Sequence, residues 1–441
     1  MAFVLKFAKT IRNNWKKSCF FAAVSIYGVK YARDSHEEEQ IRRVYCEEAR
    51  QYGHEHITLT QRPKKIYVFL NPAAHGNKGR KLFEKNAAPL LHLAGLEVVL
   101  VKTEYESQAK EFMSVIEVED AHSIVVAGGD GTLSEVVTGI LRKGNRKFEK
   151  SVPIGIIPLG NTNRFARKWF RYGMEKNTVQ AIADSAMAVI KGRIRPVDVL
   201  SIKGDDGKAT YALSGLEIGA YRDAVARKNK YWYFGPLKYR WTYVRTIMKD
   251  WPPTIKGKLQ YIPSNAEITS RSKKLESSKQ ETAESSERWS WWNLFYRSRP
   301  APTEVYEDDR EDDDAFDSEA EISRDIDTVE FTLMSGLYYE KSAESECPAV
   351  KHVDVGIGPS FPSRTELLQE GWRRINSDTL LLGTETNEHL SARKIRFSPE
   401  LTEGEELWFT IDGEHYEAKP IEVSVLKNRL NFYCSNEAPS G

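Results

Sequence analysis

The hydrophobic and polar positions of this 441-residue chain follow one pattern up to about residue 196 and another beyond it. In the first part, short apolar runs alternate with segments of helical spacing. The predicted strands are 66–70, 96–102 and 123–126, and the predicted helices lie near 79–94 and 108–116. Because strands that alternate with helices pair in parallel, this pattern predicts a doubly wound α/β domain over residues 62–196.

Beyond residue 196 the chain consists mainly of short β-prone runs. They lie at 209–213, 258–261, 329–333, 350–355, 379–382, 395–397, 407–411 and 421–426. Many short strands are typical of packed antiparallel sheets, so we predict a β-sandwich domain over residues 197–430 and a tail at 431–441. The aromatic run 231–239 is expected to pack in its core by default, or else to line a lipid slot. The predicted fold class is α/β plus β.

A strongly charged segment at 273–327 interrupts the predicted sandwich. It is rich in Ser, Glu and Lys and contains the acidic run 307–314. Such charge density does not bury enough apolar surface to fold, so we expect a disordered acidic insertion at the surface. Its aromatic residues fit either a membrane or partner contact or a local anchor onto the sandwich. These residues are Trp289, Trp291, Trp292, Phe295 and Tyr296.

The first 33 residues have the composition of a targeting segment. They contain seven Lys or Arg and no Asp or Glu, and apolar residues recur at helical spacing between residues 3 and 11. The apolar run 19–29 is shorter than the about 20 residues that a membrane-spanning helix needs. We therefore expect residues 1–33 to direct the chain to mitochondria and to associate with a membrane, and residues 34–61 to form a polar connector.

Net charge and cysteine content argue against two classes of function. A formal net charge of +1 lacks the basic surplus that general nucleic-acid binding requires. The four cysteines, Cys19, Cys46, Cys347 and Cys434, have neither CxxC nor paired spacing. Neither a zinc site nor a disulfide framework is therefore indicated.

A glycine-rich turn is the strongest motif in the chain. Gly128, Gly129, Asp130, Gly131 and Thr132 lie between a buried apolar run and a helical segment. Glycines let backbone N–H groups approach an anion closely, and the start of a helix attracts phosphate. Asp130 indicates chemistry, because a carboxylate beside phosphate requires a metal ion or a transferable proton between them. Taken alone, the motif is more often an ordinary turn with Asp at the helix N-cap.

Two further polar turns follow predicted strands. Asn71 and Pro72 begin a turn that contains Gly76 and Lys78, which can place positive charge near a phosphate. Residues 160–167 form the other turn, again between an apolar run and a helical segment. Because the carboxyl ends of parallel strands meet at one edge of a sheet, the three turns are predicted to form one site.

Together the three turns resemble the catalytic domain of the diacylglycerol kinase family, which includes sphingosine, ceramide and bacterial lipid kinases. The family's Asn-Pro turn, Gly-Gly-Asp-Gly-Thr turn and Gly-Thr-x-Asn-Asp-x-Ala-Arg segment correspond here to 71–72, 128–132 and 160–167. The third departs from the pattern, because Asn161 replaces Thr and Arg164 replaces Asp, so Arg164 receives no role from the resemblance. The basic N-terminus and acidic insertion are most similar to those of animal mitochondrial acylglycerol kinases.

The resemblance implies roles for residues in both predicted domains, with the active site in the cleft between them. Asp412, Gly413 and Glu414 resemble the family's Asp-Gly-Glu turn, although an Asp-Gly pair is also common in ordinary hairpins. Asp130 and Glu414 are the implied catalytic carboxylates, with the choice of base left open, and Asp130, Asp412 and Glu414 are the implied Mg²⁺ ligands. The implied ATP-binding residues are Asn71, Pro72, Gly76, Lys78, Gly128, Gly129, Gly131, Thr132, Gly160, Asn163 and Arg167.

These implications lead to one predicted function. We predict an ATP- and Mg²⁺-dependent lipid kinase that phosphorylates the hydroxyl of diacylglycerol and monoacylglycerol, giving phosphatidic and lysophosphatidic acid. Sphingosine or ceramide is an alternative substrate, whereas an NAD kinase, which shares a Gly-Gly-Asp-Gly turn, is disfavoured by the Asn-Pro turn. A different class of alternative is a kinase-independent subunit of a mitochondrial inner-membrane assembly or protein-import complex. The resemblance places the chain at the inner membrane, on the intermembrane-space side.

Overall fold

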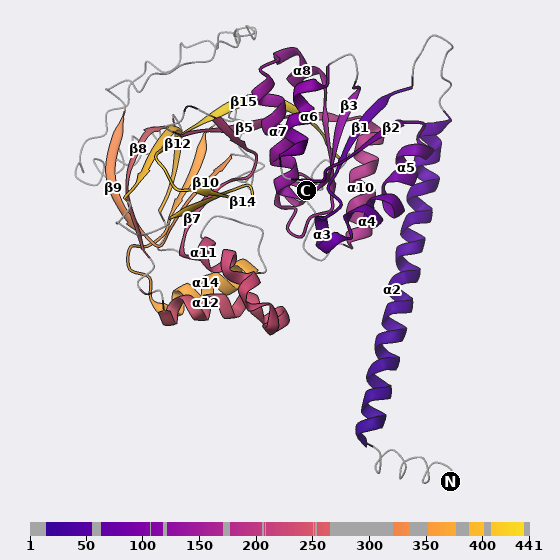
Figure 1. Cartoon of the computed structure of the whole chain (residues 1–441), viewed down its shortest axis with the longest axis horizontal. Helices are drawn as coiled ribbons and strands as arrows, with labels where there is room; N and C mark the ends of the chain where they lie inside the picture. Colours follow the sequence, from indigo (N-terminus) through magenta and orange to yellow (C-terminus); the bar gives the residue numbers. More distant parts are fainter. Residues whose placement is uncertain are drawn as a thin grey trace, which may run out of the picture.

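The computed structural model of the chain consists of two bodies joined by long strands, with one long helix at the side (Figure 1). It describes residues 15–54, 63–105, 107–117, 121–170, 177–204, 207, 209–249, 251, 254–264, 321–335, 352–375, 388–400 and 407–435. Most of the predicted acidic insertion, with its five aromatic residues, lies outside the described residues, as does the predicted strand at 379–382. Residues 322–327 at the end of that insertion belong to a strand.

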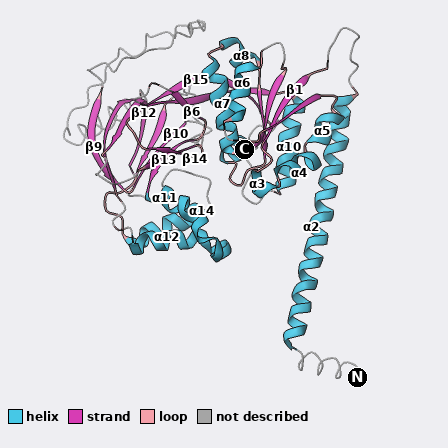
Figure 2. Ribbon diagram, viewed as in Figure 1, coloured by secondary structure: helices cyan, strands magenta, loops and turns pink. Residues whose placement is uncertain are grey.

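The first body is a parallel sheet between two groups of helices, in the strand order β4-β3-β1-β2. The strands are β1 (Lys65–Leu70), β2 (Glu97–Lys102), β3 (Ser123–Gly128) and β4 (Ile154–Pro158). The helices are α3 (Ala74–Asn77), α4 (Gly79–Asn86), α5 (Ala88–Leu93), α6 (Gln108–Val115), α7 (Asp130–Lys143), α8 (Arg146–Ser151), α9 (Arg164–Trp169) and α10 (Thr178–Lys191). Figure 2 shows α6 and α7 on one side of the sheet and α4, α5 and α10 on the other. Every residue of β3 and β4 is buried, as expected for inner strands covered on both faces.

The second body is rich in antiparallel strands, which confirms the predicted fold class of α/β plus β. The strands are β5 (Ile194–Gly204), β6 (Ala209–Ala212), β7 (Gly215–Gly219), β8 (Ile255–Pro263), β9 (Ile322–Thr328), β10 (Glu330–Ser335), β11 (Val353–Ile357), β12 (Glu388–Pro399), β13 (Trp408–Ile411), β14 (Glu414–Glu417) and β15 (Ile421–Tyr433). The rings of Phe331 and Phe397 stack with centroids 4.4 Å apart, and Phe409 meets Phe397 edge-on at 6.4 Å. These buried rings lie in a second hydrophobic core.

Two long strands connect the bodies. β15 pairs antiparallel with β5 along most of its length, and near its end Phe432 pairs with Ile154 of β4. The Phe432 ring also contacts the rings of Phe165 and Trp169. Residues 431–433, expected to begin a tail, therefore belong to β15 and help to close the core of the first body.

Four helical segments form a layer at one end of the second body, where only strands were expected (Figure 1). They are α11 (Ala220–Ala226), the 3₁₀ segment η1 (Arg227–Leu237), α12 (Lys238–Lys249) and α14 (Arg364–Ile375). Tyr243 and Leu367 are buried in a small third core within this layer. The prediction that the aromatic run 231–239 packs in the core is wrong for Trp232 and Tyr233, which are exposed because η1 lies at the surface of the layer.

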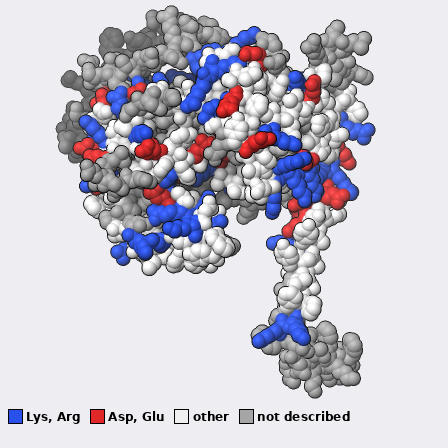
Figure 3. Space-filling model, viewed as in Figure 1, with Lys and Arg blue, Asp and Glu red and all other residues white. Residues whose placement is uncertain are grey.

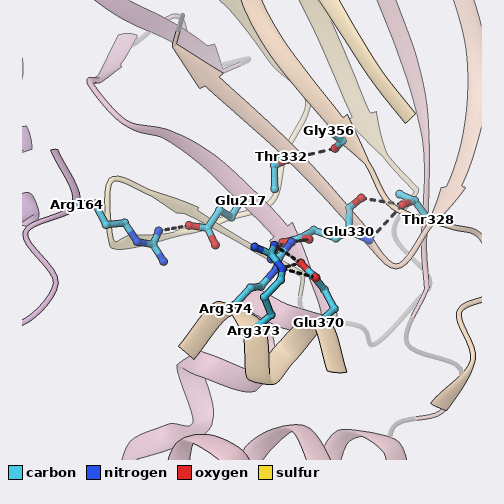
Figure 4. Close-up of polar contacts among 9 residues, drawn as sticks. All are labelled: Arg164, Glu217, Thr328, Glu330, Thr332, Gly356, Glu370, Arg373 and Arg374. Atoms are coloured by element: carbon cyan, nitrogen blue, oxygen red, sulfur yellow. Dashed lines mark hydrogen bonds and ion pairs between the residues drawn. The ribbon is translucent and has the colours of Figure 1, made fainter. Parts of the chain in front are cut away.

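A buried ion network fastens α14 to β10 (Figure 4). The Arg374 guanidinium donates to both carboxylate oxygens of Glu330 at 2.6 Å and to Glu370 at 2.9 Å. Burial raises the pKa of Glu330 to about 7. Burial alone would lower the pKa of Arg374, but the Glu330 carboxylate outweighs it and raises that pKa. Removing one partner would leave a buried polar or charged group unpaired, so the network is a strong constraint on where α14 sits.

Helix α2 (Trp15–Gly53) spans parts of both the predicted targeting segment and the predicted connector. Its C-terminal half packs against α5 and α10, where the Tyr45 hydroxyl donates to the Asp184 carboxylate and Lys191 pairs with Glu48 at 2.7 Å. Its N-terminal half extends away from the first body (Figure 1). None of the described helices combines the length and the apolar character that a membrane crossing requires.

Candidate active site

The loop after β1 is braced against the helix that follows β3. Asn71 Nδ2 donates to Thr132 Oγ1 at 3.1 Å, and Asn71 Oδ1 accepts a hydrogen bond from the Ala73 backbone N–H at 3.0 Å. Gly79 packs closely against Asn71: a Cβ at position 79 would lie 2.6 Å from the Asn71 carbonyl oxygen. The structure thus joins the first two predicted turns through side chains of both.

The remaining predicted residues of the first loop lie nearer the solvent. Gly76 has a φ of 64°, in the left-handed region that favours glycine. Gly76 and Lys78 are exposed, and Pro72 is half-buried. The neighbouring Arg80 pairs with Glu84 at 2.7 Å. Lys78 therefore lies on the solvent side of the loop.

The turns after β3 and β4 touch through their backbones. A Cβ on Gly160 would lie 2.6 Å from Cα of Gly129, so only glycine fits at this approach. Asn163 closes the third turn, since its Oδ1 accepts from the Gly160 N–H and its Nδ2 donates to the Gly160 carbonyl, both at 2.8 Å. All three turns meet at the carboxyl edge of the parallel sheet.

Asp130, the first residue of α7, ties the second turn to the third. Its Oδ2 accepts hydrogen bonds from Thr162 Oγ1 at 2.9 Å and from the Arg164 backbone N–H at 3.0 Å. Its Oδ1 accepts from the Phe165 backbone N–H at 3.2 Å. The carboxylate thereby satisfies the N–H groups at the start of α9, where negative charge is favourable. These contacts were not predicted from the sequence, and they give Asp130 a positioning role.

Glu414 reaches the start of α7 from the second body. It begins β14, and a Cβ on Gly131 would lie 3.3 Å from its Oε1. Its Oε2 accepts a hydrogen bond from the Tyr416 hydroxyl at 2.8 Å. Burial and the Glu414 charge raise the pKa of Tyr416 above its ordinary value, so this hydroxyl keeps its proton. The structure therefore brings Asp130 and Glu414 to the same end of one helix.

Asp412 has a different environment from the other two carboxylates. It lies in the turn between β13 and β14 with a φ of 46°, and Gly413 follows with a φ of 93°. Its carboxylate accepts hydrogen bonds from the backbone N–H groups of Leu213, Ser214 and Gly215 at 2.7, 2.8 and 3.0 Å. Burial raises the pKa of Asp412 to about 6, although these N–H groups lower it. The Asp-Gly pair is thus a hairpin turn that Asp412 fastens to the chain before β7.

Arg164 forms a further contact between the two bodies. Its guanidinium pairs with the carboxylate of Glu217 on β7, a largely buried side chain (Figure 4). The pair was not predicted, because its members lie in different domains. The sequence did contain one indication of such a pair, because Arg replaces the family's usual Asp at position 164. A partly buried cation needs a nearby anion.

Basic groups also adjoin the hairpin of β13 and β14. Arg222 of α11 donates to Thr410 Oγ1 at 2.8 Å and contacts His415 Nδ1 at 2.7 Å. Burial, together with the charges of Arg222 and Lys228, lowers the pKa of His415. No motif in the sequence indicated this cluster. It places positive charge one residue from Glu414.

The predicted metal ligands do not form a ready-made cluster in the part of the chain that the structure describes. Within those residues, no group of three or more His, Cys, Asp or Glu side chains gathers in a way that could hold a metal ion. The assignment of Asp130, Asp412 and Glu414 as Mg²⁺ ligands therefore remains a prediction. The last predicted ATP-binding residue, Arg167, lies on α9, the short helix that Asp130 caps.

Two family models match consecutive parts of the chain. The diacylglycerol kinase catalytic domain matches residues 65–202, and the acylglycerol kinase C-terminal model matches residues 213–440, about half of the chain. The chain belongs to the acylglycerol kinase family. It is 35% identical to the mitochondrial acylglycerol kinase of Homo sapiens over 97% of this chain and 96% of the relative. It is 34% identical to that of Xenopus laevis over 98% of this chain and 96% of the relative. This acylglycerol kinase family member is accordingly a lipid kinase.

More distant proteins place the family member among related kinases. The ceramide kinase of Mus musculus is 28% identical over 48% of this chain and 41% of the relative. A Bacillus anthracis protein, whose crystal structure was solved under the name of a diacylglycerol kinase, has a TM-score of 0.51 and 18% identity, covering 86% of this chain and 99% of that one. This second likeness shows a shared fold alone. Membership of the kinase family itself implies ATP as the co-substrate.

Proposed function

We propose that this kinase uses ATP and Mg²⁺ to phosphorylate the free hydroxyl of diacylglycerol and monoacylglycerol, giving phosphatidic and lysophosphatidic acid. The observation that carries the proposal is the approach of Glu414, from the second body, to Gly131 at the start of α7. Loops of one body can hold a triphosphate there while a carboxylate of the other body faces the acceptor alcohol. An acylglycerol acceptor is supported by the names of relatives that match over nearly the whole chain.

The proposed ATP site uses mainly the backbone of three loops. Their glycines allow close approach of N–H groups, and the start of the 14-residue helix α7 attracts phosphate. Side-chain amides and the Thr132 hydroxyl fix the loops to one another, while Lys78 and Arg167 supply positive charge. The proposed contacts come from Asn71, Pro72, Gly76, Lys78, Gly128, Gly129, Gly131, Thr132, Gly160, Asn163 and Arg167.

The proposed Mg²⁺ ligands are the carboxylates of Asp130, which begins α7, and of Glu414, which approaches Gly131 from the second body. Mg²⁺ in phosphoryl-transfer enzymes is held by one or two carboxylates together with substrate phosphates, and it neutralises charge between those phosphates. Asp130 and Glu414 fit this donor set, because one begins the helix and the other reaches it from the second body. Asp412 fits less well, since its carboxylate is buried as well as bound by three backbone N–H groups, whereas Asp130 is partly exposed to solvent. We therefore assign Asp412 to holding the hairpin.

Between the two catalytic carboxylates, we assign proton transfer to Glu414 and positioning to Asp130. Both Asp130 oxygens accept hydrogen bonds from residues 162–165, so protonation would weaken the contacts that hold the third loop. Glu414 is oriented by the Tyr416 hydroxyl and lies on the body opposite the nucleotide loops. Its carboxylate would accept the hydroxyl proton as the lipid oxygen attacks the terminal phosphorus.

A lipid panel tests the proposal. The purified chain is given ATP labelled in its terminal phosphate, with vesicles that contain diacylglycerol, monoacylglycerol, sphingosine or ceramide. We expect label in phosphatidic and lysophosphatidic acid, dependent on added Mg²⁺ and lost in Glu414→Gln. Faster labelling of sphingosine or ceramide would replace the proposed acceptor, and labelling of no lipid by the unmodified chain would overturn the proposal.

The proposed location is the mitochondrial inner membrane, with the two bodies in the intermembrane space. It is supported by the mitochondrial names of the relatives and by the basic, acid-free composition of residues 1–33. Fractionation followed by protease treatment of intact and outer-membrane-ruptured mitochondria tests it. Protection of the chain until the outer membrane opens is the expected result, and protection afterwards would place the bodies in the matrix.

A further inference from the structure

The helical layer of the second body has an unusual composition for a protein surface. Residues 227–249, which form η1 and α12, contain no Asp or Glu. Their seven basic residues are Arg227, Lys228, Lys230, Lys238, Arg240, Arg245 and Lys249. Their seven aromatic residues are Tyr231, Trp232, Tyr233, Phe234, Tyr239, Trp241 and Tyr243. Aromatic rings mixed with cations are typical of segments that lie in a membrane interface.

Several of these apolar side chains face the solvent instead of a core. Trp232 is 76% exposed, Tyr233 62% and Leu237 58%. Phe361, in the loop before α14, is 85% exposed. Single exposed apolar residues are ordinary, but a run of them on one small layer marks an interaction site.

The cations of the layer stand beside its exposed rings. The Lys238 ammonium lies 5.4 Å from the centre of the Tyr239 ring, and the Arg240 guanidinium lies 5.8 Å from that of Trp372 on α14. Figure 3 shows Lys and Arg gathered beside uncharged surface at the lower left, over this layer. The charge therefore complements an anionic surface, and the rings supply the apolar part of the contact.

A second apolar surface extends toward the same side of the molecule. The N-terminal half of α2 projects downward in Figure 1, and α12 and α14 form the lower edge of the second body in the same view. It exposes Phe20, Phe21, Ile26, Tyr27 and Val29, and two lysines precede them. One flat lipid surface below the molecule would meet both α2 and the helical layer.

The helical layer also adjoins the proposed active site. Arg222 of α11 contacts His415, the residue after Glu414, and η1 begins five residues later along the chain. Lys228 of η1 is near enough to Arg164, at the start of α9, for their charges to interact: burial, followed by the charges of Lys238 and Arg164, lowers the pKa of Lys228. The layer is therefore connected to the hairpin that carries Glu414 through the contact of Arg222 with His415.

We propose that the surface formed by Trp232, Tyr233, Leu237, Arg240 and Phe361 docks on an anionic lipid bilayer and presents a bilayer-resident alcohol to Glu414. Docking itself is independent of the kinase chemistry, whereas presentation of the alcohol rests on the proposed function. The occupant is a membrane because exposed aromatic side chains stand beside cations such as Arg240, in a segment without Asp or Glu, and because the exposed half of α2 extends toward the same side.

Fluorescence quenching tests the docking. The full chain and its Trp232→Phe variant are mixed with brominated vesicles of phosphatidylcholine and phosphatidylglycerol, and with brominated phosphatidylcholine alone. The two chains differ only at residue 232, so the difference in their emission measures the fluorescence of Trp232. This holds even if α2 also binds lipid. We expect this difference to be quenched on the anionic vesicles and less on the neutral ones. Absence of Trp232-dependent quenching on anionic vesicles would overturn the proposal. A protein partner would then be the better explanation of this surface.

Kinase assays test presentation of the alcohol. The triple variant Trp232→Ser, Tyr233→Ser, Leu237→Ser is expected to lose at least about tenfold activity on vesicle-embedded diacylglycerol, because it removes three apolar side chains from the contact with the bilayer. Its activity on a water-soluble short-chain diacylglycerol should be unchanged. The control is Tyr105→Ser with Val115→Ser, which removes exposed apolar groups from the first body and should not alter the ratio. An unchanged ratio in the triple variant would overturn presentation.

These outcomes separate the docking proposal from the proposed function. A chain that shows Trp232-dependent quenching but phosphorylates no lipid would retain the docking surface and refute the kinase assignment to acylglycerols. A chain that phosphorylates diacylglycerol without Trp232-dependent quenching would support the proposed function and refute the docking surface.

Discussion

The two bodies of this kinase build their shares of the candidate active site by different means. In the first body the loops meet through bare backbone, as at Gly129 and Gly160, and through neutral amides such as Asn163. In the second body the residues around the site are buried charges, among them Asp412 and Glu217.

The difference fits what each body is proposed to hold. A triphosphate requires N–H groups at close range, which glycines provide, whereas an acceptor alcohol requires a carboxylate held at a fixed position. A site made of close backbone contacts is sensitive to added atoms. A site made of buried charges is sensitive to neutralisation. Substitutions that add a methyl group and substitutions that remove a charge therefore test the two bodies separately.

The largest expected effect comes from neutralising the carboxylate that the second body contributes. Glu414→Gln keeps the size of the side chain but removes the proposed proton acceptor. Loss of a general base typically costs about 100- to 10,000-fold in rate, so we expect kcat on diacylglycerol to fall by that range. Steady-state kinetics measure the rate, and ATP titration at saturating Mg²⁺ should show nucleotide binding within about threefold of that of the unmodified chain.

Glu417→Gln is the matched control for this change. Glu417 lies on the same strand but faces the solvent, where it pairs with Lys419 at 2.9 Å. We expect activity near that of the unmodified chain. If Glu414→Gln retained most of its turnover, Asp130 would become the candidate for the base.

The next effect comes from adding one methyl group to the first body. In Gly160→Ala the new Cβ would lie 2.6 Å from Cα of Gly129 and 2.7 Å from Oδ1 of Asn163, so the two loops must separate. Overpacking of this kind costs about 1–3 kcal/mol, and we expect a tenfold or greater rise in KM for ATP. Thermal unfolding and ATP kinetics measure both effects.

Gly28→Ala provides the control for this substitution. Gly28 lies within α2, where an added Cβ meets no atom within 4 Å. We expect no loss of stability and no change in KM. A Gly160→Ala chain with an unchanged KM for ATP would mean that this backbone contact does not shape the nucleotide site.

The asymmetry between the bodies also determines what the sequence could predict. The three loops were predictable, because each is a continuous stretch in which residue types such as those at 128–132 indicate a local conformation. The partners of Asp130 and Asp412 were not, since Thr162 and Leu213 come close only when the strands are in register. Contacts of this kind depend on the topology of the whole fold.

The helical layer was missed for a different reason. The aromatic content of residues 231–239 favoured a buried position, as large rings usually do. The signal against burial was the charge of the surrounding stretch, since residues 227–249 contain seven Lys or Arg and no Asp or Glu. Exposed aromatic residues such as Trp232 and Tyr233, within a basic segment that lacks acidic residues, fit an interface better than a core.

A third effect is expected where the second body is held by a buried ion pair. Arg374→Met removes the cation that contacts both oxygens of Glu330, and leaves that carboxylate buried without its partner. Breaking such a pair costs about 3–5 kcal/mol, which denaturant unfolding measures. The double variant Glu330→Gln, Arg374→Met should recover part of this loss. A double variant less stable than Arg374→Met would contradict the role given to charge.

An exposed pair gives the comparison for that experiment. Arg43 and Glu39 form an i,i+4 pair at 2.6 Å on α2, with both side chains largely in solvent. Solvent screens such a surface pair, so Arg43→Met should destabilise the chain far less than Arg374→Met does.

The last expected effect is a pH dependence carried by Asp412, which develops gradually over about two pH units. Burial raises the pKa of this carboxyl from 3.8 to about 6, so between these values the folded chain holds a proton that the unfolded chain has released. Stability contributed by Asp412 therefore falls as pH rises from about 4 to 6, by up to about 3 kcal/mol. Asp412→Asn cannot titrate, so the difference in unfolding free energy between the unmodified chain and the variant should shrink over this window. The difference in unfolding free energy between the unmodified chain and Asp412→Ala must change with pH in the same way, because alanine cannot titrate either. It should differ from the Asp412→Asn difference by a constant amount, because alanine has no acceptor for the N–H groups of residues 213–215. A difference that stays constant from pH 4 to 7 for both variants would mean that the backbone donors, and not burial, control the charge of this side chain.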